Sequence, residues 1–181
     1  MSNSPEKQSG KIYIYTNSIW ERTGSFADPH TFGLLGRRAD TEPTKVVLRY
    51  MDGAVLKGYM RSLHPHHLTF HFQADDEGIF DQEMGIDGLK ALFLVKSFEG
   101  DSSYRERKRF AEEDTSYGNK AEVIFGDGEI MQGWISGYLQ EQPGFFLRPA
   151  DPKSNNILVL APSAAVKGLR RLGDFEMGST P

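Results

Sequence analysis

The chain has 181 residues, of which 38% are hydrophobic and 12% aromatic, enough to build one ordinary core or two small ones. Its net charge of -4 and pI near 5.7 give no electrostatic reason to expect nucleic acid or acidic lipid. The absence of cysteine excludes disulfides, thiolate catalysis and cysteine-ligated zinc.

No apolar run in the sequence is long enough to cross a membrane, and residues 1–11 lack the apolar core of a signal peptide. We therefore expect a cytoplasmic protein without membrane insertion.

Residues 1–43 form an irregular arm in which aromatic residues are scattered among Gly, Ser, Asn and Asp. These aromatic residues are Tyr13, Tyr15, Trp20, Phe26 and Phe32. They are too many for a plain linker, and two interpretations stay open. The arm packs against its own protein, or it docks a partner or a second subunit, since aromatic anchors dominate interface energetics.

Two later segments carry the same pattern, "LRYMDGAVLKGY" at 48–59 and "VIFGDGEIMQGW" at 123–134. In each, apolar residues alternate up to an Asp-Gly pair typical of a tight hairpin turn. A second strand follows, interrupted by a glycine of the kind that marks a bulge or sharp bend. The turn and bend residues are Asp52, Gly53, Gly58, Asp127, Gly128 and Gly133.

The match continues through "HLTFHF" and "GFFLRP", a fourth short strand in each copy, and "GLKALFLVKSFE" against "AVKGLRRLGDFE". Five short strands in so few residues hide their edges best by closing into a barrel. The sequence thus predicts an all-β protein with small barrels at 44–98 and 120–175, a linker at 99–119 and a tail at 176–181. In the linker, Ser103 followed by Glu106 predicts a helix over about 103–113.

The "DGAVLKG" and "DGEIMQG" elements resemble those of SH3-like small barrels, and among them the Sm-like fold, in which such an element opens a strongly bent second strand. The resemblance covers both units and implies two tandem five-stranded barrels. The second unit also resembles an uncharacterised bacterial domain, and no activity comes with that resemblance.

Basic residues suggest two further contacts. Arg105 and Arg109 repeat the R-x3-R spacing by which PilZ domains hold cyclic dinucleotides, but the D-x-S-x2-G partner of those domains is absent, and a solvated helix explains the charges without a ligand. A patch on the second unit would need Phe145 or Phe146 exposed beside it to bind RNA. Its residues are Lys167, Arg170, Arg171 and Arg148.

Histidines cluster at His64, His66, His67 and His71. His67 and His71 lie too far apart along one strand to share a metal ion, and only His64 and His66 could converge. The carboxylates of residues 75–87 follow no EF-hand spacing. We expect no metal, no cofactor and no catalytic residue.

Three hypotheses remain. The first is a non-enzymatic interaction or scaffold module that binds protein and can form a homo-oligomer through its arm. The second is a protein of the Sm-like type that binds single-stranded RNA, and the third is a ligand or cyclic-dinucleotide sensor.

Overall fold

The computed structural model describes residues 43–64, 68–75, 82–114, 119–136 and 142–172, except for the side chains of Ser62, His64 and Ser136. Within these ranges ten strands form, together with one turn of 3-10 helix, η1 (Ser163–Ala165). The strands are β1 (Thr44–Tyr50), β2 (Val55–His64), β3 (Thr69–Ala74), β4 (Gln82–Met84), β5 (Leu89–Val95), β6 (Asn119–Phe125), β7 (Ile130–Ser136), β8 (Gly144–Pro149), β9 (Asn156–Pro162) and β10 (Val166–Leu172).

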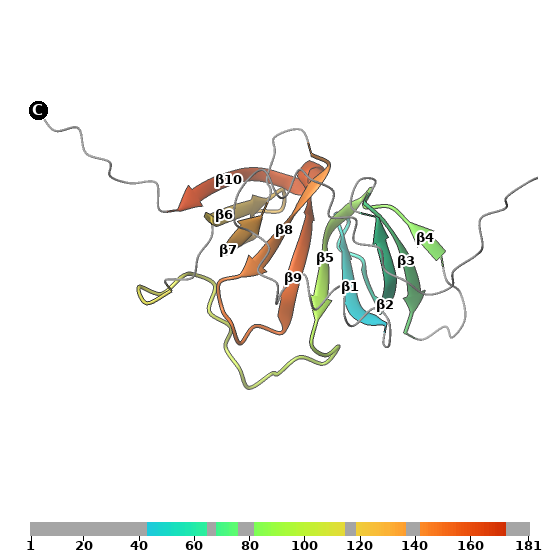
Figure 1. Cartoon of the computed structure of the whole chain (residues 1–181), viewed down its shortest axis with the longest axis horizontal. Coiled ribbons are helices and arrows are strands. Elements are labelled where there is room, and N and C mark those ends of the chain that lie inside the picture. The colour runs from blue at the N-terminus through green and yellow to red at the C-terminus, as the bar shows by residue number, and fades with distance from the viewer. Residues whose placement is uncertain (1–42, 65–67, 76–81, 115–118, 137–141, 173–181) are drawn as a thin grey trace, which may run out of the picture.

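All ten strands belong to one antiparallel sheet with the order β10-β6-β7-β8-β9-β5-β1-β2-β3-β4. We call β1 to β5 the first half and β6 to β10 the second half. The halves join where β5 pairs with β9, and Figure 1 shows these two strands side by side at the centre.

The prediction of an all-β protein is confirmed, but the prediction of two closed barrels is wrong. The sheet is open: among the strands that the structure describes, β4 pairs only with β3, and β10 pairs only with β6. Instead of closing a barrel within its own half, β5 pairs with β9 of the other half and so joins the two halves into one sheet. The two halves are therefore parts of one sheet and not separate barrels.

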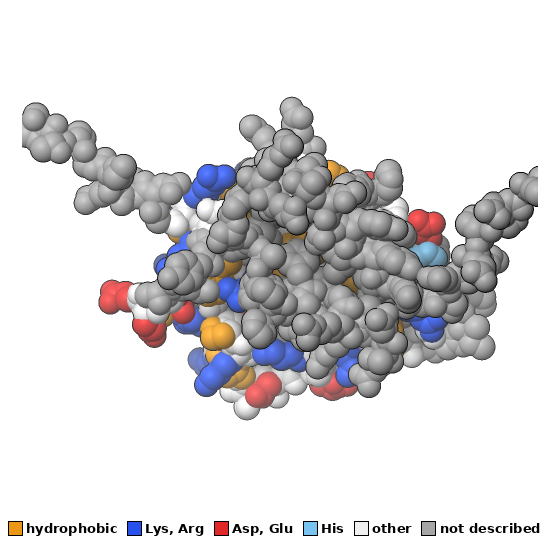
Figure 2. Space-filling model, in the orientation of Figure 1, with side chains coloured by type: hydrophobic (Ala, Val, Ile, Leu, Met, Phe, Trp, Pro, Cys, Tyr) orange, Lys and Arg blue, Asp and Glu red, His pale blue; other side chains and the backbone are white. Residues whose placement is uncertain are grey.

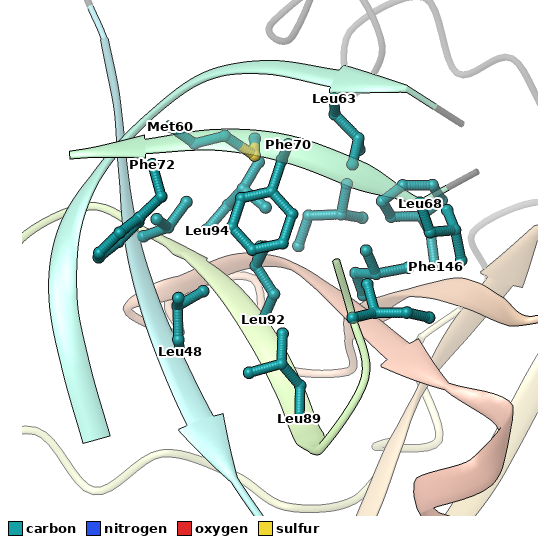
Figure 3. Close-up of a cluster of buried hydrophobic side chains, with 14 residues drawn as sticks. Leu48, Met60, Leu63, Leu68, Phe70, Phe72, Leu89, Leu92, Leu94 and Phe146 are labelled. Carbon is teal, nitrogen blue, oxygen red and sulfur yellow. The ribbon is translucent and has the colours of Figure 1, made fainter. Parts of the chain in front are cut away.

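Two hydrophobic clusters lie on opposite faces of this sheet. The first cluster covers the first half and includes Leu48, Met60, Phe70 and Leu92 (Figure 3). Phe146 of β8 joins the same cluster from the second half. The second cluster covers the second half and is built around residues such as Val123, Phe125, Met131, Ile135 and Leu147.

The central strands are buried on both faces. Along β5, Leu92 and Leu94 enter the first cluster, whereas Ala91, Phe93 and Val95 enter the second. Every residue of β5 is buried as a result. We define the outer face of each half as the face turned away from that half's own cluster. Because the two clusters lie on opposite faces of one sheet, the outer face of each half is on the same side of the sheet as the cluster of the other half.

The duplication extends to the pairing register. Leu48 lies opposite Leu92 in the first half, and Val123 lies opposite Leu169 in the second. Each of these ladders also contains one irregularity. At that point Lys90 of β5 has no partner residue on β1, and Lys167 of β10 has none on β6. The halves are therefore two copies of one strand plan.

The two Asp-Gly turns have the same geometry. Gly53 and Gly128 have φ of 93° and 86°, in the left-handed region that glycine tolerates. The aspartate before each glycine accepts a hydrogen bond from the backbone N–H two residues further on, at 2.9 Å for Asp52 and 3.0 Å for Asp127. The turns lie near each other, since Met51 Cε is 3.4 Å from where a Cβ on Gly126 would be.

The glycines inside β2 and β7 are required by close backbone approach. A Cβ on Gly58 would lie 2.2 Å from the Gln73 carbonyl oxygen, and a Cβ on Gly133 would lie 2.2 Å from that of Arg148. No side chain fits at such distances, so glycine is required at both positions.

Lys90 links the halves electrostatically. Its ammonium group forms ion pairs with Asp127 and Glu129 at the turn of the second half, and the lysine itself is buried. Burial opposes the charge of Lys90, but the hydrogen bonds that its ammonium group donates to the two carboxylates outweigh burial and raise its pKa. The hydrogen bond from Lys90 in turn lowers the pKa of Asp127.

Gly133→Ala is expected to lower the free energy of unfolding by roughly 1–3 kcal/mol, because the methyl group forces the Arg148 backbone away. Denaturant unfolding measures the loss. Gly168→Ala is the matched control: its Cβ would meet nothing closer than 3.7 Å, so stability should hold. Equal losses in both variants would contradict the close-approach argument.

Lys90→Ala is expected to destabilise the protein by about 1–3 kcal/mol, because a buried alkyl stem and two charged hydrogen bonds are lost. Lys167→Ala removes the exposed lysine at the equivalent irregularity and should change stability by less than about 0.5 kcal/mol. Thermal unfolding of both variants tests this, and a stable Lys90→Ala protein would show that the ion pairs do not hold the halves together.

Candidate functional site

The linker contains no helix within its described residues 99–114, so the predicted helix over 103–113 is wrong. The backbone N–H and hydroxyl of Ser103 donate to Asp101 Oδ1 in a local turn, so Ser103 does not begin a helix. Further along, distant side chains accept from the backbone. Arg107 N–H donates to Asp151 at 2.8 Å and Phe110 N–H to Gln132 at 3.0 Å. These contacts replace the hydrogen bonds that a helix would have made.

Phe110 anchors the linker on the outer face of the second half. Its ring packs edge-on against Trp134 of β7, with 4.7 Å between ring centroids. Lys120 lies over the Phe110 ring at 5.0 Å, and Arg148 lies over Trp134 at 4.6 Å. Trp134 is 8% exposed, and its indole N–H has no hydrogen-bond partner within the described residues. The linker thus occupies an aromatic and cationic face.

A buried polar chain supports this contact. Glu122 accepts hydrogen bonds from Gln132 Nε2 and from Arg170 Nη2, each at 2.8 Å. The amide oxygen of Gln132 then accepts the N–H of Phe110. These side chains satisfy one another's hydrogen bonds, as buried polar groups require. They therefore position the linker.

Asp151 holds the beginning of the docked segment. It is 4% exposed and accepts from the Tyr104 hydroxyl at 2.7 Å and from the Arg107 N–H. Burial opposes its charge, but these hydrogen bonds and one from the Lys153 N–H keep the pKa of Asp151 below its ordinary value. The Arg107 guanidinium also pairs with Asp114 at 2.6 Å.

The first half has a matching arrangement on its own outer face. Lys45 and Tyr59 lie opposite each other on β1 and β2, as Lys120 and Trp134 do on β6 and β7. Phe98, which follows β5, packs edge-on against Tyr59 at 5.4 Å, and Lys45 lies 5.7 Å from the Phe98 ring. Both aromatic rings remain half-buried. Within the described chain, no segment like the linker covers this face.

Four cations, Lys45 among them, lie on β1 and β2 in the same half. Lys57 Nζ donates to the Phe98 carbonyl at 3.0 Å, Arg49 lies 5.5 Å from the Phe93 ring, and Arg61 donates to Gln73 at 3.2 Å. With Lys45 they form a group in which no member has an ion pair with a described residue. We call this group and the two rings the basic aromatic face. Its members are Lys45, Arg49, Lys57, Tyr59, Arg61 and Phe98.

Acidic groups lie at the rim of this face. Burial and the nearby carboxylates of Asp75 and Glu99 raise the pKa of Tyr59. The charge of the face is therefore mixed at one side and positive across β1 and β2.

The predicted basic patch of the second half is divided between separate contacts. Arg170 is paired with Glu122 and Arg148 stacks on Trp134, while Lys167 and Arg171 are exposed on β10. Phe145 and Phe146, one of which was expected to face solvent, are 3% and 7% exposed, because both faces of β8 are covered. Neither ring is available to stack on a base.

Arg105 and Arg109 are exposed on the non-helical linker. Figure 2 shows Lys and Arg side chains along the lower edge of the molecule, where Figure 1 places the linker. The anchored arginine of this segment is Arg107, which the sequence pattern did not single out. Arg107 differs from its neighbours in its contacts with Asp151 and Asp114. Nothing in the local sequence indicates the contact with the distant Asp151.

Several expected residues lie outside the described chain, namely the aromatic residues of the arm and the side chains of His64, His66 and His67. His71 is half-buried on β3. The described residues contain no group of three or more His, Asp or Glu side chains placed to hold a metal ion. Nor does any described helix have the length and hydropathy needed to span a membrane.

The open sheet and the faces it presents define an all-β protein with an internal duplication. The chain belongs to a family of unknown function, DUF6982, whose model matches residues 42–173. That match spans both halves, so the expectation of an uncharacterised domain holds as membership of a family of unknown function, over both units and not the second alone. No curated protein and no solved structure matches the chain.

Phe110→Ala is expected to speed tryptic cleavage after Arg105, Lys108 and Arg109 roughly tenfold, because losing the ring pair and its burial favours the undocked linker by about 1–2 kcal/mol. Mass spectrometry of limited digests measures the rates. Glu112→Ala changes an exposed residue of the same segment and should leave them unaltered. Equal cleavage in both variants would show that Phe110 does not anchor the linker.

Proposed function

We propose that this protein is a non-enzymatic interaction module, and that its basic aromatic face binds an extended acidic segment of a partner protein. The single observation that carries the proposal is the docked linker. The outer face of the second half holds an irregular peptide segment by an aromatic pair and by hydrogen bonds from the peptide backbone.

The duplicated strand plan extends this observation to the first half. Because Lys45 and Tyr59 occupy the positions of Lys120 and Trp134, the first half presents the same kind of surface. In that half the ring of Phe98 supplies part of what Phe110 supplies in the second. A partner segment would extend along the remaining surface beside Phe98, across β1 and β2.

The charges define the chemistry of the partner. Arg49, Lys57 and Arg61 are exposed and have no ion pair with described residues, so carboxylates can approach them without displacing an existing partner. Charged contacts across such a surface add specificity and association rate, and apolar or aromatic contacts add most of the affinity. We therefore expect a segment that alternates acidic with aromatic or aliphatic residues.

A second candidate function is the binding of single-stranded RNA on the same face. Two half-buried rings beside four cations could stack bases and neutralise phosphates. The docked linker favours the peptide, since it is a polypeptide chain held on the equivalent surface.

Fluorescence anisotropy with a labelled peptide that alternates Glu and Phe tests the proposal on the full chain. The double variant Arg49→Glu/Lys57→Glu should weaken binding roughly tenfold, because two exposed contacts of a few tenths to one kcal/mol each are reversed. The control variant Arg105→Glu/Lys153→Glu makes the same charge change at exposed positions outside the face and should bind normally.

Equal weakening in both double variants would mean that binding follows net charge, which contradicts a defined site. Binding of a single-stranded oligouridine but not of the peptide, with a steep loss as salt rises, would replace the proposal by the second candidate. If neither probe binds, the basic aromatic face is not an acidic-ligand site.

A further inference from the structure

The strands at the two ends of the described sheet are the duplicated equivalents of the two strands that pair at its centre. At the centre, β9, the fourth strand of the second half, pairs with β5, the fifth strand of the first half. At the ends lie β4, the fourth strand of the first half, and β10, the fifth strand of the second half. The two end strands of the described sheet therefore correspond to the two strands that already pair with each other at its centre.

The duplication also fixes the register that such a contact would have. Phe93 lies opposite Val159 at the central junction. The equivalent of Phe93 on β10 is Arg170, because Leu92 and Leu169 occupy matched positions opposite β1 and β6. The equivalent of Val159 on β4 is Gln82, because Gln82 pairs with Phe72 as Val159 pairs with Leu147. Arg170 of one chain would thus face Gln82 of another.

The same register places opposite charges near each other. Glu83 on β4 would face Leu169 and lie diagonally next to Arg171, within reach of its long side chain. Glu83 and Arg171 are both exposed in the described chain. The β4 end thus offers a carboxylate where the β10 end offers a cation.

A second charge pair follows from Lys90. At the central junction this lysine, at the irregularity of β5, binds Asp127 in the turn of the other half. Lys167 stands at the same irregularity of β10, and Asp52 stands in the equivalent turn of the first half. Both are exposed, and neither has an ion pair with a described residue.

We propose that two copies of this chain associate head to tail, with β10 of one copy adding antiparallel to β4 of the next. The backbone ladder is continued, Lys167 meets Asp52 of the neighbour, and Arg171 meets Glu83 of the neighbour. Because the contact uses two different surfaces, it repeats from copy to copy and closes only if the rotation between copies completes a ring.

The contact is weaker and more sensitive to salt than the central junction. At the centre, Phe146 and Leu160 of the second half insert into the first cluster. Their equivalents at the end of the sheet are His71 and Glu83, which bring no comparable apolar surface. Short, charged edge strands normally limit such pairing, so the association depends on matched charges and is reversible.

Mixing two cysteine variants tests the proposal, since the natural chain has no cysteine. A full-length Gln82→Cys chain is mixed with a full-length Arg170→Cys chain under mild oxidation. Cross-strand neighbours have the spacing that a disulfide needs. We expect the mixed disulfide to form several times faster than with Glu112→Cys in place of Gln82→Cys, and Lys167→Glu in the Arg170→Cys chain should slow it.

Mass spectrometry identifies the linked residues. Efficient disulfides within the Gln82→Cys protein alone would indicate a two-fold contact through β4 and overturn the proposal. Oligomers in sedimentation velocity without the mixed disulfide would also overturn it, and would favour the N-terminal arm as the contact. A monomer at every concentration and salt level would overturn it as well. None of these outcomes alters the peptide-binding test, which concerns a different face.

Discussion

The pairing of β5 with β9 is the contact on which the rest of the structure depends. It joins two copies of one strand plan into a single sheet, so that the central strands bury both faces. A fully buried Leu or Phe side chain contributes about 1.5–3 kcal/mol, and Leu92, Phe93 and Leu94 are all buried here. Each half shares its core with the other, because Phe146 packs in the first cluster and Phe93 packs in the second.

This junction also explains why the two outer faces differ in use. The connection from β5 to β6 has to travel from the junction across the second half, and it does so along that half's outer face, where Asp151 and Gln132 accept its backbone N–H groups. The first half has the equivalent positions, and of the residues that the structure describes Phe98 packs on them. The two copies of the strand plan therefore carry one outer face that the linker occupies and one basic aromatic face.

The ladder patterns explain what could be predicted and what could not. Alternation in β1 and β6 and the Asp-Gly turns are local features, and they place the strands. The apolar run of β5 does not alternate, which indicates burial on both faces. The same run is compatible with a core strand of a small barrel, so it does not by itself indicate an open sheet. The basic aromatic face had no local signal, because Lys45, Lys57 and Phe98 are brought together only by strand pairing.

The sequence by itself determined that this protein is all-β, that its strand plan is duplicated, and where its Asp-Gly turns and the glycines inside its strands lie. These depend on residues close together in the chain, whose spacing sets side-chain direction and backbone freedom. The tertiary structure decided that the sheet stays open and that the linker is not helical. Those outcomes depend on hydrogen bonds and burial between distant residues, such as Phe110 with Trp134, whose free energy outweighs local propensity.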